Sequence, residues 1–287
     1  MRNISSRRVS TGRILAYAVL VIASAFYLTP IYILVITGLK GFKDVSLATM
    51  WHLPDKLNFE SFANAWLGNS SLGISGLSQN FWNSVILAVP ATIFSALLGS
   101  LNGYVLSKWK FRGANVVFPL ILFGMFIPYQ SVLIPLVRIL QSMGLYGSIG
   151  GLIFVHVVYG IPITTLIFRN YYAEVPNELL EAGKVDGAGI LGIYGRILFP
   201  LSITGFIVVM IWQFTSVWND FLFGVIVTSR PAVQPITVAL NNMAGSYSVQ
   251  WNVQMAGAFM AALPTLLVYI CLSRYFMSGL LAGSVKG

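Results

Sequence analysis

The sequence predicts an all-α polytopic membrane protein with six transmembrane helices. Apolar residues make up 57% of the 287 residues and charged residues only 9%, a balance typical of membrane proteins rather than soluble domains. Six apolar windows have about 20 residues or more, enough to cross a bilayer at a helical rise of about 1.5 Å per residue. Pro128 and Pro135 interrupt the third of them. The windows are Ile14–Leu39, Phe81–Leu106, Val116–Val137, Ile149–Phe168, Leu201–Val227 and Met255–Met277.

The first window could belong to a cleaved signal peptide or to a retained helix. Arginines precede it, and Ala23-Ser24-Ala25 could mimic a signal-peptidase site. The apolar run nevertheless continues to Leu39, which is too long for the core of a signal peptide. We therefore expect a retained membrane anchor.

The lysines and arginines predict which helix ends face the cytoplasm. Most of the 17 basic residues fall in the N-terminal tail, the loops after the second and fourth windows, and the C-terminus. The positive-inside rule places these segments in the cytoplasm, so both termini are expected there. The same bias accounts for the net charge of +9, and we infer no nucleic-acid binding from that charge.

The segment Lys40–Asn80 is then the largest external one. It is too short and too polar for an independent core. We expect a solvated loop with an interfacial helix near Phe59–Leu67. A landing surface for an external protein is compatible with the same features.

The sequence contains no motif for catalysis, nucleotide binding or metal binding. It has no G-x-x-x-x-G-K-[ST] loop, no H-E-x-x-H and no Cys/His cluster, and its one cysteine, Cys271, cannot form an intramolecular disulfide. Only His156 and Asp220 fall clearly inside the windows as ionisable groups, which is not the chain of such residues that an ion-coupled carrier uses. We expect His156 to be a hydrogen-bonded packing residue. We also expect no catalytic residue, metal site or cofactor on this chain, and an energy source on another chain.

A charged segment, Glu181–Pro200, separates the fourth and fifth windows. Pro176 can begin a short helix before it, because the missing N–H of proline is unsatisfied at a helix start anyway. The turn-forming residues of Asp186–Gly189 are expected to end that helix, and a second one is expected over about Ile190–Leu198. Two short helices at a bend, with small residues exposed, suit a cleft in another protein.

Polar residues gather in the fifth window. Gln213, Ser216 and Asp220 are three and four residues apart, so they share one helix face. This stripe could line a water-accessible path for a polyhydroxylated solute, and Trp212 and Trp218 could stack on the C–H faces of a sugar. The alternatives are hydrogen bonds between helices for the stripe, and packing or interfacial anchoring for the tryptophans.

Small residues and prolines in the windows have structural interpretations. Gly99 with Gly103, and Gly147 with Gly151, have the small-xxx-small spacing that lets two helices approach closely. Prolines inside the windows could bend the helices there. They are Pro30, Pro90, Pro162 and Pro264.

The charged segment resembles the EAA loop of ATP-binding-cassette importer permeases. The matching pattern is Glu181-Ala182-Gly183, Asp186-Gly187-Ala188 and Ile197-x-x-Pro200. Gly183 stands where the family usually has alanine, which keeps the small size but softens the helix by about 1 kcal/mol.

Further segments resemble the maltose-type carbohydrate permeases in particular. They are Trp218-Asn219-Asp220-Phe221, Pro128-Tyr129-Gln130 with Pro135, Leu145 and Gly147, and the ending Gly279–Gly287. The resemblance covers nearly the whole chain.

The resemblance implies a heteromeric importer of the bacterial inner membrane. Such a complex pairs this permease with a second homologous permease, two cytoplasmic ATPase subunits that bind ATP and Mg, and an extracytoplasmic solute-binding protein. The residues implied in coupling to the ATPase are Glu181, Ala182, Gly183, Asp186, Gly187 and Pro200. Those expected along the translocation path are Gln213, Ser216, Asn219 and Asp220.

The sequence is therefore interpreted as a permease subunit of an ATP-driven, binding-protein-dependent importer of a sugar or a related polyol or glycoside. The alternatives are an ABC permease for a non-sugar small solute and a stand-alone ion-coupled carrier. We expect a basic cytoplasmic tail (1–13), a first helix with its external loop (14–80), a permease core (81–281) and a cytoplasmic C-terminal tail (282–287). The core includes a coupling loop at 170–200 between the fourth and fifth helices.

Overall fold

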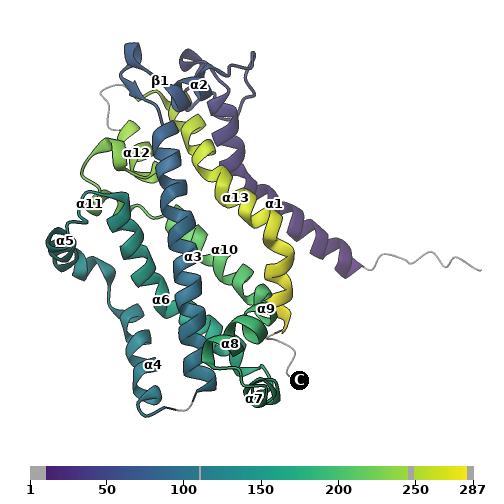
Figure 1. Ribbon diagram of the computed structural model, residues 1–287. Helices are drawn as coiled ribbons and strands as arrows, with labels where there is room; N and C mark the ends of the chain where they lie inside the picture. Colours follow the sequence, from purple (N-terminus) through teal and green to yellow (C-terminus); the bar gives the residue numbers. More distant parts are fainter. Residues whose placement is uncertain (1–10, 110, 245–248, 283–287) are drawn as a thin grey trace, which may run out of the picture. The chain divides into compact units, whose positions relative to one another are not determined.

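The computed structural model describes residues 11–109, 111–244 and 249–282, and helices dominate them (Figure 1). Several predictions concern residues outside these ranges: the tail arginines Arg2, Arg7 and Arg8, Lys110, and the chain end after residue 282. The described chain divides into two compact units. One unit comprises Met1–Gly76 with Met243–Met260, and the other comprises Leu77–Asn242 with Ala261–Gly287.

Four helices among the described residues are long and apolar enough to cross a membrane. They correspond to the first, second, fourth and sixth predicted windows, and each contains one of the four prolines. The helix of the fourth window is capped at its start by Ser148, whose Oγ accepts a hydrogen bond from the Gly151 N–H at 3.0 Å. The helices are α1 (Thr11–Gly38), α3 (Ser78–Lys108), α6 (Ile149–Ala173) and α13 (Trp251–Ala282).

The third predicted window is broken rather than one helix. The helical pair Ala114–Phe126 and Tyr129–Ser142 is bent by 93°. Pro128 explains the break, because proline disfavours helical backbone at the preceding residue, and Ile127 is extended with φ −75° and ψ 120°. The elements here are α4 (Ala114–Phe123), η3 (Gly124–Phe126), η4 (Tyr129–Val132) and α5 (Leu133–Ser142).

The fifth predicted window is also divided. α10 (Ile203–Trp218) ends before Asp220, and α11 (Leu222–Val227) begins after it. Upstream, the helical stretch Ile190–Leu201 meets α10 at a bend of 78°, so Pro200 lies within that stretch rather than opening α10. The described chain thus has four spans, or up to six if each bent pair counts as one.

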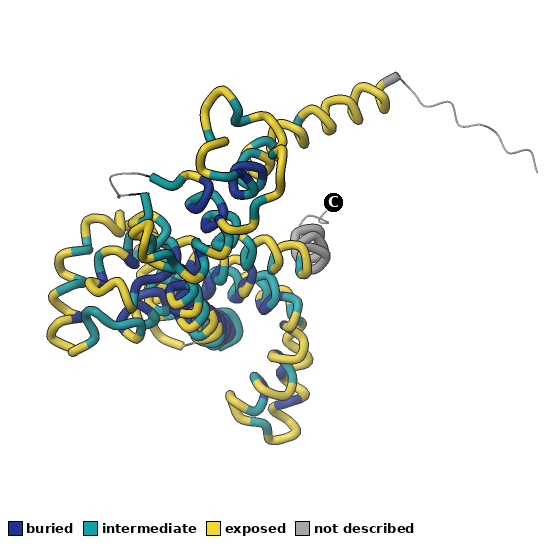
Figure 2. Tube along the Cα trace, turned by 90° about the horizontal axis from the view of Figure 1, so that it is seen from above, coloured by how far each residue is buried: buried dark blue, intermediate teal, exposed yellow. Residues whose placement is uncertain are grey.

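The first unit combines α1 with a small subdomain formed by the segment after it. A helix is present where one was expected, near Phe59–Leu67. It is α2 (Glu60–Leu67), which is followed by the antiparallel strands β1 (Gly68–Asn69) and β2 (Ile74–Ser75). Phe62 and Ala65 of α2 pack with Val253 and Ala256 at the start of α13. Most described side chains of α1 are exposed (Figure 2), as expected of a helix that faces lipid.

The second unit is organised around the pair α3 and α6. A Cβ at Gly99 would overlap the Thr164 side chain, and a Cβ at Gly103 would lie 2.7 Å from Arg169 N and from Phe168 Cβ. The close helix approach expected at this glycine pair is therefore confirmed.

The second glycine pair does not serve helix approach. Gly147 has φ +79° in the turn before α6, and its N–H donates to the Val227 carbonyl at 2.9 Å. Gly151 faces the Leu145 carbonyl of the same turn. The expectation for these two glycines was wrong because they shape a turn at the helix start.

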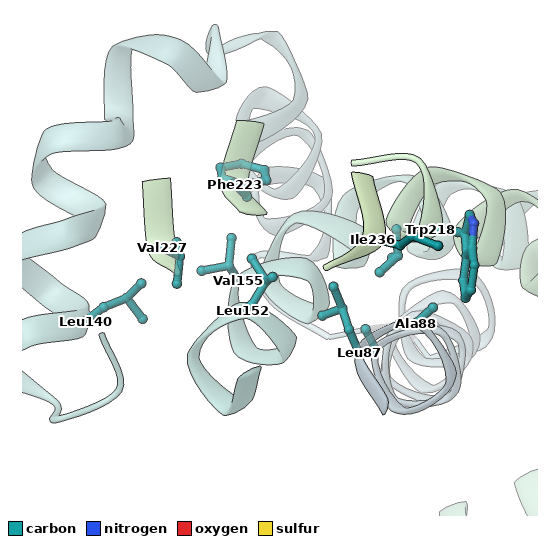
Figure 3. Close-up of a cluster of buried hydrophobic side chains, with 11 residues drawn as sticks. Leu87, Ala88, Leu140, Leu152, Val155, Trp218, Phe223, Val227 and Ile236 are labelled. Carbon is teal, nitrogen blue, oxygen red and sulfur yellow. The ribbon is translucent and has the colours of Figure 1, made fainter. Parts of the chain in front are cut away.

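A hydrophobic cluster fills one end of this unit (Figure 3). It joins side chains of α3, α5, α6, α10, α11 and α12 (Ile236–Met243) in a row from Leu140 to Trp218. Trp218 is only 2% exposed, and its Nε1–H donates to the Ala261 carbonyl at 2.9 Å. The hypothesis that Trp218 stacks on a sugar is therefore wrong, and its packing alternative holds.

A second cluster, at the other end of α3 and α6, contains a buried hydroxyl network. The Tyr172 hydroxyl lies 2.6 Å from Ser100 Oγ and 3.0 Å from Ser202 Oγ. The Tyr194 hydroxyl donates to the same Ser100 Oγ at 3.0 Å. The network ties α3 and α6 to the π-helix η5 (Tyr194–Leu198) and to the corner before α10.

We expect Tyr172→Phe to destabilise the protein through this network. Removing the Tyr172 hydroxyl leaves two buried serine hydroxyls with one partner fewer, at a cost of about 1–3 kcal/mol. Thermal unfolding of the purified protein should show a midpoint several degrees lower. Tyr171→Phe is the matched control, because the Tyr171 hydroxyl donates to the Leu201 carbonyl at an exposed position. Equal losses for the two variants would contradict a special role for the buried network.

Candidate functional site

A cavity of about 980 Å³ opens among α6, α10, α11 and residues 124–132. Its lining combines aromatic and aliphatic side chains with a few polar groups, as binding clefts for small molecules commonly do. The polar and aromatic residues that line it are Tyr129, His156, Tyr159, Trp212, Gln213, Ser216, Asn219, Asp220, Phe221 and Phe223.

All four residues predicted along the path line this cavity. Gln213 and Ser216 lie on one face of α10, and Asn219 and Asp220 follow directly after its last residue. Trp212 lines the cavity too and is 53% exposed, unlike the buried Trp218. The structure therefore brings the polar stripe together at one surface.

Gln213 also forms the hydrogen bonds between helices that were the alternative interpretation of the stripe. It is 4% exposed, and its Nε2–H₂ group donates to Ser95 Oγ at 3.2 Å and to the His156 carbonyl at 3.3 Å. Gly160 makes room for it, because a Cβ at that position would overlap Gln213 Nε2. Gln213 thus joins α3, α6 and α10 at the cavity wall.

Asp220 caps the helix that follows it. Its carboxylate oxygens accept the N–H groups of Phe223 at 3.4 Å and Gly224 at 3.0 Å, which satisfies backbone donors at the start of α11. The Asp220 carbonyl accepts the Thr237 hydroxyl at 2.6 Å. The predicted span therefore breaks here because this carboxylate begins a new helix.

His156 faces Asp220 across the cavity wall. Its Nε2 lies 3.5 Å from Asp220 Oδ2, and the residue is 6% exposed. His156 Nε2 is buried and forms no hydrogen bond with the described residues. The His156 ring packs on Phe223, as expected of a packing residue, but the hydrogen bond expected of it is not formed at Nε2. His156, Tyr159 and Ile163 are three and four residues apart on α6, so they share one helix face. This spacing could have predicted the face of α6 that lines the cavity.

The charged segment forms the two short helices expected of it. α7 (Asn177–Val185) follows Pro176, which is the N-cap residue, and the turn after it contains Gly187 with φ +77°. α8 (Ile190–Ile193) continues through η5 into α9 (Phe199–Leu201), so the second helix extends past its predicted end and includes Pro200.

The predicted coupling residues differ in exposure. Glu181, Ala182, Asp186, Gly187 and Pro200 are exposed. Gly183 is buried, and a Cβ there would lie 2.8 Å from Ile197 Cδ1 and 3.4 Å from Ile193 Cγ1. Its small size therefore serves packing within this segment, which corrects the idea that Gly183 offers close approach to a partner.

The end of α3 holds α7 in place. The Lys108 ammonium group donates to the Val175 carbonyl and, at 3.0 Å, to Asn177 Oδ1. Lys184 Nζ lies 4.9 Å from the centroid of the Trp109 ring, within the range of a cation–π contact. These contacts fix the segment while its outer face stays exposed.

The sequence matches the family described as binding-protein-dependent transport system inner membrane component over residues 91–277. A probable ABC transporter permease protein of Pyrococcus horikoshii is 45% identical over 98% of this chain and 100% of its own length. A xylose/arabinose import permease protein of Haloferax volcanii is 36% identical over 95% of this chain and 93% of its own.

The fold is shared with a chain of a bacterial ABC transporter involved in the import of the acidic polysaccharide alginate. The TM-score is 0.79 at 19% identity, covering 94% of this chain and 100% of that one. Together the matches confirm the resemblance to ABC importer permeases. The chain belongs to the family of inner membrane components of binding-protein-dependent transport systems.

Proposed function

We propose that this chain forms half of the membrane pathway of an ATP-driven importer for a sugar or a related polyol or glycoside. The observation that carries the proposal is the cavity, where polar residues of the α10 stripe lie beside aromatic side chains. Hydroxyl groups need many hydrogen-bonding partners, and aromatic faces suit the C–H faces of sugars. The relative that imports xylose and arabinose supports this substrate class.

In the proposed importer the broken helical pair over 114–142 counts as one span and α10 with α11 as another, which gives six with the four long helices. The segment α7–α9 is then the coupling loop between the fourth and fifth spans, and both termini lie in the cytoplasm. The chain works with a second homologous permease, two ATPase subunits that bind ATP and Mg, and an external solute-binding protein. It has no catalytic role of its own.

The exposed face of α7–α8 is the surface we assign to the ATPase. It carries Glu181 and Asp186 beside the apolar side chains of Val185 and Leu191, which are 88% and 73% exposed. Exposed apolar groups beside charges are typical of a protein interface. Closure of the ATPase pair would then move this segment, and with it the helices tied to it by the Tyr172 network.

The energy source tests the proposed function directly. We expect uptake of sugar by vesicles that contain the whole complex to require ATP hydrolysis and to persist when ionophores collapse ion gradients. Omitting the ATPase subunits should abolish it. Uptake that continues without these subunits and stops with the ion gradient would establish the stand-alone carrier instead.

Charge reversal at Glu181 should uncouple the ATPase. We expect Glu181→Lys to reduce both co-purification of the ATPase and uptake, while membrane insertion stays normal. The change puts a positive charge on the face of α7–α8 where the proposed ATPase contact is suited to a negative one. Glu60→Lys is the matched control, since Glu60 is exposed on α2, on the predicted external side. Normal co-purification and uptake with Glu181→Lys would contradict the assignment.

The predicted orientation can be tested with single cysteines in a Cys271→Ser background. An impermeant thiol reagent applied to intact spheroplasts should label Ser71→Cys, in the external segment, and should fail to label Lys184→Cys on α7. Permeabilised membranes supply the control, because both positions are exposed and should then react. The reverse pattern in intact spheroplasts would overturn the orientation.

A further inference from the structure

His156, which is buried, and Asp220, which is partly buried, lie next to each other in the cavity lining. His156 Nε2 is buried, lies at the cavity wall and forms no hydrogen bond with the described residues. Its nearest charged neighbour is Asp220 Oδ2 at 3.5 Å, which is longer than the usual N–H···O hydrogen bond. A ligand hydroxyl beside both groups would give this nitrogen a partner at hydrogen-bonding distance.

Asp220 is held rigidly opposite this nitrogen. Its carboxylate is fixed by the N–H groups of Phe223 and Gly224, and its own carbonyl by Thr237. These bonds hold Oδ2 in place, 3.5 Å from His156 Nε2. The imidazole is held as well, because its ring packs edge-on against Phe223 with centroids 5.7 Å apart.

The two groups match a hydroxyl. A hydroxyl oxygen can donate its proton to a carboxylate oxygen and at the same time accept a hydrogen bond from an imidazole N–H. Aromatic rings stand beside this position, since Tyr129 and Tyr159 pack on Phe223 with centroids 5.5 Å and 4.9 Å apart. The pair thus combines hydrogen-bonding groups with an apolar wall.

The charge at this position discriminates between classes of solute. Asp220 is the only acidic residue among the described residues that line the cavity, and none of them is lysine or arginine. A carboxylated sugar would bring a second negative charge towards Asp220 without a fixed cation from this chain to offset it. A neutral sugar meets no such repulsion.

We propose that His156 and Asp220 form a hydroxyl-binding subsite that favours neutral hydroxylated solutes over carboxylated ones. The inference rests on the proposed function, since it names the class of solute accepted by the same pathway. His156 acts here as a specificity-determining residue.

Solute protection of a cavity cysteine tests the subsite without the binding protein. The assembled permease–ATPase complex would carry Ser216→Cys and Cys271→Ser, with partner subunits free of cysteine, because Ser216 is exposed and lines the cavity. The measured quantity is the concentration of glucose, or of glucuronate, that halves the rate of thiol labelling. We expect glucose to protect at a lower concentration than glucuronate.

Variants of the pair then identify the groups responsible. His156→Phe should raise the half-protecting glucose concentration about tenfold, as expected when one hydrogen bond between the protein and a sugar hydroxyl is lost. His156→Gln, which keeps an N–H donor, should recover part of the loss. Asp220→Asn should narrow the preference for glucose over glucuronate, which a purely structural role of Asp220 would leave unchanged. His52→Phe is the matched control, because it makes the same substitution at the other, exposed histidine.

The outcomes separate this inference from the proposed function. Protection by glucose that is the same in His156→Phe, Asp220→Asn and the parent complex overturns the subsite and leaves the pathway intact. Absence of protection by glucose in the parent complex, together with absence of ATP-dependent sugar uptake, overturns both. Assembly is checked by size-exclusion chromatography, and the half-protecting concentrations are compared only between assembled complexes.

Discussion

The close approach of α3 to α6 is the contact on which the second unit depends. Apolar side chains gain little from leaving lipid for a helix interface, so association in a bilayer relies on close backbone approach and buried hydrogen bonds. Gly99 and Gly103 supply the approach. Two serines of α3 then accept hydrogen bonds: Ser95 from Gln213 at the cavity, and Ser100 from Tyr194 in the charged segment. One helix pair therefore supports both the cavity wall and the charged segment.

The break after α10 shows why polar residues gather there. Backbone groups at an interrupted helix must find partners, because lipid offers none. Asn219 Nδ2 donates to the Thr215 carbonyl at 2.9 Å, and Asp220 accepts two N–H groups of the next helix. The same side chains line the cavity. The structural and the pathway interpretations of the stripe are thus compatible, since one residue can meet both needs.

Apolar length and local turn residues were enough to predict α1, α3, α6, α13 and α7. The break at Pro128 had a local cause, which the sequence displayed. The division of the fifth span was harder to predict, because the apolar residues of α11 continue the pattern of α10 and only the cap by Asp220 separates them. The burial of Trp218 and the contact of His156 with Asp220 join helices that are distant in sequence. Helices that are apolar on all sides give no periodicity that predicts such contacts.

Because residues of the stripe both line the cavity and hold the helices together, only some of them are suitable for testing the proposed pathway by mutation. Asp220 holds the start of α11, so any loss of transport on its removal includes a change in the fold. Gln213 likewise joins three helices. The His156 side chain is different: its ring packs on Phe223, but its Nε2 supports no element by hydrogen bonding. His156→Phe keeps an aromatic ring next to Phe223 and removes the ring nitrogens, so it alters the cavity lining without removing a hydrogen bond of Nε2. In this chain His156 is the position where the chemistry of the proposed path and the stability of the fold can be separated.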